Sequence, residues 1–115
     1  MEKTDSQKSQ IAQKLEEYEE MSDSVLDESF SIFVRMLKTC ANKNPLVCRL
    51  MAAIFNKNLE GLNLHSTVRE ALPIFMALDP WTVIRWKNVG CASVNLMLAM
   101  QHEIKKIAEK KGWVF

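Results

Sequence analysis

At 115 residues the chain has room for one domain with a single core, and not for two. Hydrophobic residues make up 48% and charged residues 25%, which is ordinary for a globular protein and excludes general disorder. Only three glycines and three prolines punctuate the chain, which favours long helices over a many-stranded sandwich or barrel. The composition therefore predicts an all-α single domain, a compact bundle of five to six helices.

The net charge of +1 conceals an uneven distribution. Residues 1–28 hold three lysines against nine acidic residues, and residues 29–115 hold twelve basic against five acidic residues. A basic body suggests attraction to nucleic acid or another anionic surface, and the acidic arm could fold back and compete for it. The simpler alternative is that both charge sets only keep the protein in solution.

Cysteine usage and hydropathy bear on the compartment. The three cysteines lie in apolar helical contexts without a C-x-x-C pair, which predicts buried, reduced thiols: Cys40, Cys48 and Cys91. No stretch approaches the roughly 18 uninterrupted apolar residues of a membrane span, and the polar N-terminus is unlike a secretory signal. We expect an intracellular protein of the cytoplasm or nucleus, neither secreted nor membrane-bound.

The first elements in chain order are an acidic arm, residues 1–24, and a core domain, residues 25–115. Over residues 5–21 one narrow apolar stripe runs along an otherwise polar predicted helix, which would pack lightly on the body or pair with a second copy. Its members are Ile11, Leu15, Tyr18 and Met21. Ser24 and Asp27 then resemble a capping box, and a second helix is predicted to about residue 40. Its apolar spacing suits a core helix or a helix–helix seam, through Leu26, Phe30, Phe33, Leu37 and Cys40.

Helix-start signals mark the next elements. Asn44 as N-cap and Pro45 predict a third helix to about residue 57, ending before Gly61. Its apolar face is formed by Val47, Leu50, Met51 and Ile54. Thr67 and Glu70 match a T-x-x-E capping box, and a fourth helix should follow, kinked or broken at Pro73.

The last two predicted helices occupy residues 80–88 and 92–111. Asp79 before Pro80 is a start signal for a short helix, although Trp81, Thr82 and Val83 are also good strand formers. The final helix is apolar nearly all round in its first half, which predicts deep burial there. Gly112 should then take the left-handed C-cap position, with Trp113 folded back on the last turns.

Enzyme machinery is missing from the sequence pattern. His65 and His102 have no metal-ligand partner at helical spacing, and no phosphate loop or nucleophile elbow occurs. Cys91 could be a reactive thiol at a helix start, but a buried structural cysteine is the better interpretation. We therefore expect a protein without catalytic activity, cofactor or bound metal.

The most specific pattern lies in residues 69–88, around Leu78-Asp79-Pro80-Trp81-Thr82-Val83-Ile84-Arg85-Trp86. This segment resembles the turn and recognition helix of helix-turn-helix DNA-binding regulators, with apolar residues at the inward positions. The Arg85-Trp86-Lys87 triplet before an apolar helix is also similar to the CII-type activators of lambdoid phages. The resemblance implies a recognition helix in the major groove and action as a dimer or higher oligomer.

Under this resemblance, four side chains would face bases or the groove wall: Trp81, Thr82, Arg85 and Asn88. Lys87, together with Arg69, would contact phosphates. Arg suits guanine and Asn suits adenine, each contributing roughly 1–3 kcal/mol of discrimination. The structural alternative is that Trp81 and Trp86 anchor the core while Arg85 is merely solvated.

The second function hypothesis is a helical protein–protein interaction module, of the kind found among viral accessory proteins or adaptors. It would use its N-terminal helix or an apolar groove, and the candidate interface residues are Ile11, Leu15, Tyr18, Leu26, Phe30 and Met97. Met side chains are adaptable enough to line such a groove, although they fill cores more often. The two hypotheses differ in their expected salt dependence, since only phosphate binding releases counterions.

Overall fold

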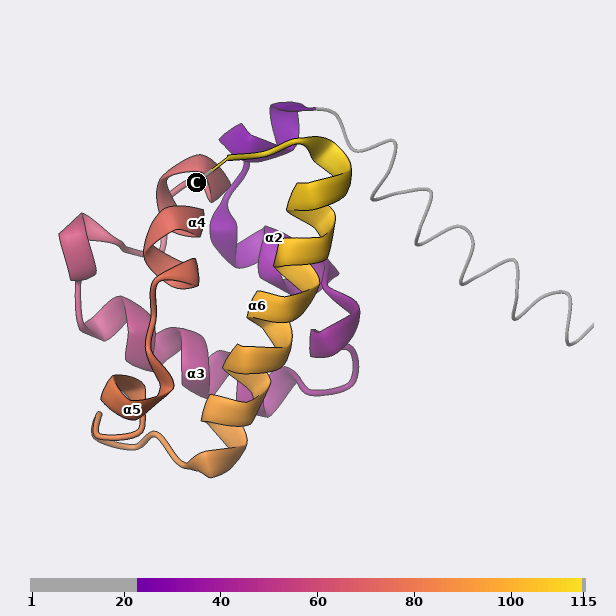
Figure 1. Ribbon diagram of the computed structural model, residues 1–115. Coiled ribbons are helices and arrows are strands. Elements are labelled where there is room, and N and C mark those ends of the chain that lie inside the picture. The colour runs from indigo at the N-terminus through magenta and orange to yellow at the C-terminus, as the bar shows by residue number, and fades with distance from the viewer. Residues whose placement is uncertain (1–22, 115) are drawn as a thin grey trace, which may run out of the picture.

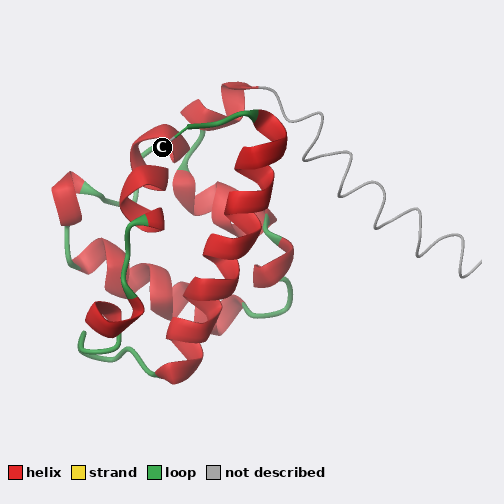
Figure 2. Cartoon of the chain, in the orientation of Figure 1, coloured by secondary structure: helices red, strands yellow, loops and turns green. Residues whose placement is uncertain are grey.

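A computed structural model describes residues 23–114. Five α-helices and three short 3₁₀ turns (η) make up this part of the chain, with no strand beyond one isolated bridge (Figures 1 and 2). The elements are η1 (Asp23–Asp27), α2 (Phe30–Met36), η2 (Lys38–Cys40), α3 (Asn44–Asn56), η3 (Leu59–Gly61), α4 (Val68–Met76), α5 (Pro80–Val83) and α6 (Cys91–Lys111). The predicted all-α, single-domain bundle is confirmed, whereas the predicted helix over residues 5–21 lies outside the described residues.

Helix α6 is the central element of the bundle. It runs the length of the body, with α3 and α5 packed near its N-terminal half and η2 beside it (Figure 1). Helix α4 closes the remaining side and packs on η1 and α2. The largest fully buried side chains come from four helices and the segments between them: Phe30, Phe33, Val34, Leu37, Leu50, Ile54, Leu62, Leu72, Phe75, Met97, Met100 and Ile104. One contiguous core therefore unites the described elements.

The continuous second helix predicted up to residue 40 is wrong, because the segment is divided into η1, α2 and η2. Before α2, the Phe30 N–H donates to the Ser66 carbonyl (3.0 Å) and the Val68 N–H donates to the Glu28 carbonyl (2.8 Å). These bonds hold the chain extended at Ser29, which forms an antiparallel bridge with Thr67. A contact across almost forty positions thus overrides the local helical pattern.

The second interruption is at Leu37, whose ψ of 137° is extended. Directly after it, the Glu103 carboxylate of α6 accepts hydrogen bonds from the backbone N–H groups of Lys38 (2.9 Å) and Thr39 (2.8 Å) and from the Thr39 hydroxyl (2.7 Å). A carboxylate at these orphan donors stabilises the start of η2. The predicted inward positions are nevertheless confirmed as buried: Phe30, Phe33, Leu37 and Cys40.

Helix α3 follows its prediction closely. The N-cap is Lys43 rather than Asn44, which places Pro45 in the first turn, where its missing N–H costs nothing. All four predicted inward residues are buried: Val47, Leu50, Met51 and Ile54. The left-handed residue after α3 is Asn58, with φ 51°, so the chain turns three residues before Gly61.

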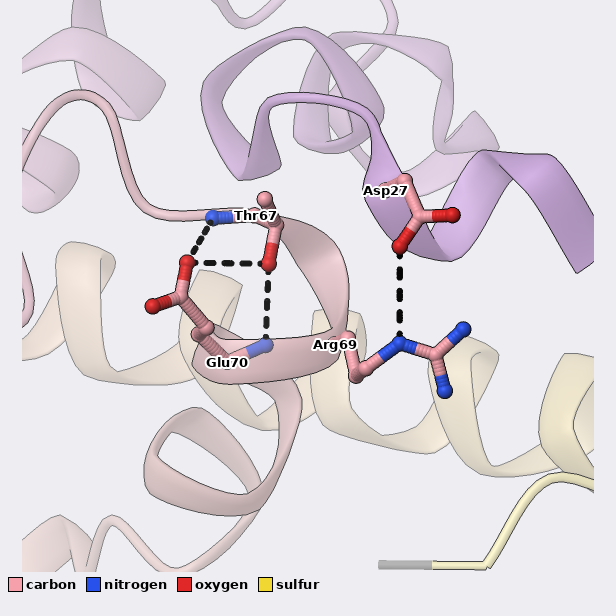
Figure 3. A network of polar contacts seen from close by, with 4 residues as sticks. All are labelled: Asp27, Thr67, Arg69 and Glu70. Atoms are coloured by element: carbon pink, nitrogen blue, oxygen red, sulfur yellow. Dashed lines mark hydrogen bonds and ion pairs between the residues drawn. The ribbon is translucent and has the colours of Figure 1, made fainter.

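Helix α4 begins with the predicted capping box. The Thr67 hydroxyl accepts from the Glu70 N–H (3.2 Å), and the Glu70 carboxylate accepts from the Thr67 N–H and hydroxyl (3.0 Å each), as Figure 3 shows. Pro73 was expected to kink or break the helix. The helix does not break there, because it continues to Met76 with Pro73 on its exposed side.

Helix α5 begins as predicted at Asp79 and Pro80, but ends at Val83 rather than near Asn88. After Val83 the backbone hydrogen bonds span three residues instead of four. The Arg85 N–H donates to the Thr82 carbonyl (3.2 Å), and the Trp86 N–H donates to the Val83 carbonyl (3.0 Å). Asn88 is left-handed, with φ 67°, which a helix cannot contain. Helix α6 then ends as predicted at Gly112 (φ 71°), and Trp113 folds back, its N–H donating to Ala108 (2.9 Å).

Candidate nucleic-acid interface

The α5 segment exposes most of the side chains that the sequence assigned to nucleic acid. Trp81 is 74% exposed, so it is not the core anchor of the structural alternative. Thr82 and Arg85 are exposed as well. One carboxylate oxygen of Asp79 accepts hydrogen bonds from the Thr82 backbone N–H (3.2 Å) and from the Thr82 hydroxyl (3.1 Å). Thr82 therefore takes part in the cap of α5.

Trp86 differs from Trp81 because it is half-buried against the core. The Lys57 ammonium, just after α3, lies 5.4 Å from the centroid of the Trp86 ring, within the range of a cation–π contact. This contact ties the end of α3 to the loop between α5 and α6. Trp86 therefore packs against the core, as the structural alternative predicted for both tryptophans.

Two predicted residues of that loop meet the outer face of α3. Lys87 and Asn88 line a depression of about 360 Å³ together with four residues of α3: Arg49, Ala52, Ala53 and Asn56. We call these six residues the α3–α5 surface. Among the described residues that line it there is no carboxylate, so its charged groups are cationic, and two carboxamides supply further donors and acceptors.

The contribution of α3 to this surface was not predicted from the sequence. Arg49, Ala52, Ala53 and Asn56 are spaced by three, one and three residues, which places them on one side of a helix. That side lies away from the apolar face, the only face of α3 that the sequence pattern described. The alanines between Arg49 and Asn56 could have indicated an accessible polar side of this helix. No local pattern indicated that Lys87 would lie opposite that side.

Arg69 does not join the other predicted residues. Its Nε lies 3.5 Å from the Asp27 carboxylate in an exposed ion pair (Figure 3). It also lines a cavity of about 260 Å³ with Lys111 and Trp113, at the C-terminal end of α6, whereas α5 packs at the other end of the molecule (Figure 1). A helix of 21 residues is roughly 30 Å long, so Arg69 and Lys87 are too distant to hold one phosphate.

The candidate interface residues of the second hypothesis are also dispersed. Ile11, Leu15 and Tyr18 lie outside the described residues. Leu26 is half-buried and lines the same 260 Å³ cavity as Arg69. Phe30 and Met97 are 0% exposed, which corrects their assignment to a partner surface, because core packing already covers them.

The three thiols differ in their exposure to solvent. Cys40 is buried, and its burial, together with the nearby Glu103 carboxylate, raises its pKa to about 11. Cys48 and Cys91 are exposed, contrary to the prediction that all three thiols are buried. In the described part of the chain, no three His, Cys, Asp or Glu side chains are grouped so that they could hold a metal ion. No helix in that part is long and apolar enough to cross a membrane.

Comparison of the chain with protein-family models, with curated proteins and with solved structures found no match.

Proposed function

We propose that this chain is a non-enzymatic nucleic-acid-binding regulator that holds phosphates on the α3–α5 surface. The observation that carries the proposal is the depression in which Arg49 and Lys87 lie beside Asn56 and Asn88 without a lining carboxylate. Cationic side chains bind phosphates by releasing counterions, and carboxamides add hydrogen bonds to phosphate oxygens, sugars or bases. The net charge of residues 29–115, twelve basic against five acidic residues, favours approach of a polyanion.

The helix-turn-helix resemblance enters the proposal in a modified form. Helix α4, residues 77–79 and α5 supply the helix, the turn and the start of a second helix. Because α5 has only four residues, contacts would come from its first turn and the following loop rather than from a long helix lying in the major groove. Trp81 offers an exposed indole on which an unpaired base could stack. Single-stranded nucleic acid is therefore the preferred ligand, ahead of duplex DNA.

Fluorescence anisotropy of labelled single-stranded RNA, single-stranded DNA and duplex DNA at about 50 and 200 mM salt tests the proposal. Arg49→Ala and Lys87→Ala should each weaken binding and reduce the slope of log K against log salt by about 0.7 on single strands. Trp81→Ala should weaken binding to single strands by roughly 1–3 kcal/mol and leave duplex binding nearly unchanged. Arg85→Ala tests the neighbouring predicted base contact.

Lys105→Ala is the matched control, because Lys105 is exposed on α6 and does not line the depression. Equal losses in Lys105→Ala and Lys87→Ala would mean that net charge alone drives binding. No binding by the unsubstituted protein at micromolar concentration would sink the proposal.

A second candidate function is protein–protein association, including self-association, through an apolar patch on α2. Ile32 (57% exposed) and Met36 (44% exposed) are four residues apart and thus share one side of α2. Leu64 (59% exposed) lies nearby, because its carbonyl accepts from the Ser31 hydroxyl (3.4 Å). If this patch is an interface, Ile32→Asp should convert an oligomer to a monomer in sedimentation velocity, with little dependence on salt. An unchanged sedimentation coefficient would exclude the patch as a self-association surface.

A further inference from the structure

A groove distinct from the α3–α5 surface follows α6 from Ala99 to Lys110. Its volume is about 410 Å³, and we call it the α6 groove. Helix η2 contributes Lys38 and Thr39 to its lining. The lining residues of α6 recur every three or four positions along one side of the helix: Ala99, His102, Glu103, Lys106, Ile107 and Lys110. The groove therefore lies between two elements that are far apart in the sequence.

The two elements that border the α6 groove are fixed to each other by Glu103. Its carboxylate accepts hydrogen bonds from the backbone N–H groups of Lys38 (2.9 Å) and Thr39 (2.8 Å) and from the Thr39 hydroxyl (2.7 Å). These bonds form within the protein itself and need no ligand. The groove is therefore formed before a ligand arrives, which reduces the entropic cost of binding.

The lining of the α6 groove is largely apolar and carries cationic groups. Ala99 and Ile107 supply aliphatic surface, and the stems of the lysines add hydrocarbon. Among the described residues that line the groove there are three lysines, Lys38, Lys106 and Lys110, and one carboxylate, which is the one that bonds to η2. An occupant complementary to this lining has an aliphatic body and a negative charge.

The size of the α6 groove favours a small molecule over a protein segment. From Ala99 to Lys110 the groove follows eleven residues of α6, about 16 Å. Its volume falls within the range of small-molecule sites, roughly 300–1,000 Å³. A stable protein interface buries at least about 1,000 Å² and depends on large apolar anchors, whereas the aliphatic side chains in the described lining are only those of Ala99 and Ile107. A single aliphatic chain therefore suits the groove better than a partner helix.

We propose that the α6 groove binds a small aliphatic carboxylate of the medium-chain fatty acid type. Its chain lies along Ala99 and Ile107, and its carboxylate lies among the ammonium groups of the lysines. Burial of the chain supplies affinity, and charge-assisted hydrogen bonds from lysine hold the carboxylate. This site goes beyond the proposed nucleic-acid function, since the α6 groove and the α3–α5 surface share no residue.

Decanoate, added to the ¹⁵N-labelled full chain below the concentration at which it forms micelles, tests the site. Saturable chemical-shift changes should appear at the amides of Thr39, Ala99 and His102, which line the groove. The amides of Ala52 and Asn56, on the α3–α5 surface, should change little. The absence of a saturable shift at millimolar decanoate, or shifts concentrated on the α3–α5 surface, would overturn the proposal.

Related ligands separate the contributions of chain and charge. Each methylene added between hexanoate and decanoate should lower Kd by about two- to fourfold, since full burial of one methylene corresponds to about fourfold. Decanol, with a neutral head, and decyltrimethylammonium, a cation, should both bind more weakly than decanoate. Equal Kd values for decanoate and decanol would show that the lysines do not recognise the carboxylate. Equal Kd values for hexanoate and decanoate would show that the chain is not buried, and either result contradicts the proposal.

Lys106→Glu tests the cationic part of the site, because Lys106 is exposed on α6 and lines the groove. The substitution should raise the Kd for decanoate by roughly threefold or more, since it replaces an attraction by a repulsion at a solvent-exposed position. The Kd for decanol should change little. Lys105→Glu is the matched control, because it changes the net charge equally at an exposed position outside the groove. Equal losses in the two variants would mean that net charge alone governs binding, which contradicts a built site.

Sedimentation with lipid vesicles distinguishes a free carboxylate from a membrane surface. Vesicles of phosphatidylcholine and phosphatidylserine present aliphatic chains and anionic headgroups together. If the groove were a membrane contact, the protein would sediment with these vesicles, and Lys106→Glu would release it while Lys105→Glu would not. That result would replace the small ligand by a lipid surface and overturn the proposal. Sedimentation that is the same in both variants agrees with a free ligand in the groove.

Discussion

The capping box of α4 shows how one carboxylate couples stability to pH. Two hydrogen bonds from Thr67 lower the pKa of the Glu70 carboxyl below its ordinary value of 4.5. The bond from the Thr67 backbone N–H has the larger effect, and the bond from the Thr67 hydroxyl has the smaller one. Because the folded pKa is the lower one, the carboxylate stabilises the fold fully above the unfolded value. This contribution is lost as the pH falls through the folded pKa.

Glu70→Gln should therefore make the free energy of unfolding less dependent on pH. Urea denaturation at several values between about pH 3 and pH 6 measures it, because protonation of this group can no longer weaken the native state. Glu109→Gln, at an exposed position near the end of α6, is the control and should keep the wild-type dependence. Identical pH profiles for the wild type and Glu70→Gln would contradict the role of the capping box.

At the scale of elements, a single side chain links α4 and the α5 turn to α6. The Gln101 carboxamide donates hydrogen bonds to the carbonyls of Phe75 (3.0 Å) and Leu78 (3.1 Å). The Phe75 carbonyl also accepts from the Leu78 backbone N–H (3.2 Å), so Gln101 adds a second donor there and supplies a donor to the Leu78 carbonyl in the turn after α4. The turn that positions Trp81 thereby depends on a residue in another helix.

Gln101→Ala should lower the free energy of unfolding by about 1–3 kcal/mol, because the Leu78 carbonyl loses its side-chain donor and the Phe75 carbonyl keeps only its backbone bond to the Leu78 N–H. Hydrogen exchange should also accelerate selectively at the amides of residues 77–86, since the turn loses its attachment to α6. Asn95→Ala, exposed on the same helix, provides the comparison and should change neither quantity appreciably. Uniform acceleration across the molecule would instead indicate global destabilisation.

Elements were predictable from sequence where their determinants are local. The cap at Thr67, the start at Asp79 and the left-handed Gly112 depend on side chains within a few positions, and all three are confirmed. The division of residues 23–40 was not predictable, because it depends on the bridge between Ser29 and Thr67 and on Glu103. Partners so far away in sequence leave no local pattern.

At the scale of the whole molecule, the same limit applies to the candidate site. The helical pattern identified Lys87 and Asn88 as exposed polar residues, but their neighbours Arg49 and Asn56 come from α3. Which helix faces a loop depends on how α3 crosses α6, and helix crossing is set by the packing of both surfaces. Part of the surface was therefore predictable from the sequence, whereas the predicted grouping of Arg69 with Lys87 is wrong because the two residues are remote from each other.

The packing of α6 provides the last prediction, through two adjacent residues in opposite environments. Met97 is 0% exposed, whereas Leu98 is 41% exposed, although the sequence shows both in one apolar run. Met97→Ala should lower the free energy of unfolding by about 2–5 kcal/mol, because it leaves a cavity in the core. Leu98→Ala should cost much less, since water already reaches that side chain. Urea unfolding followed by circular dichroism measures both, and equal losses would contradict the orientation of α6. The same comparison separates the two roles considered for Met97, since a partner-binding methionine would affect association while leaving the free energy of unfolding nearly unchanged.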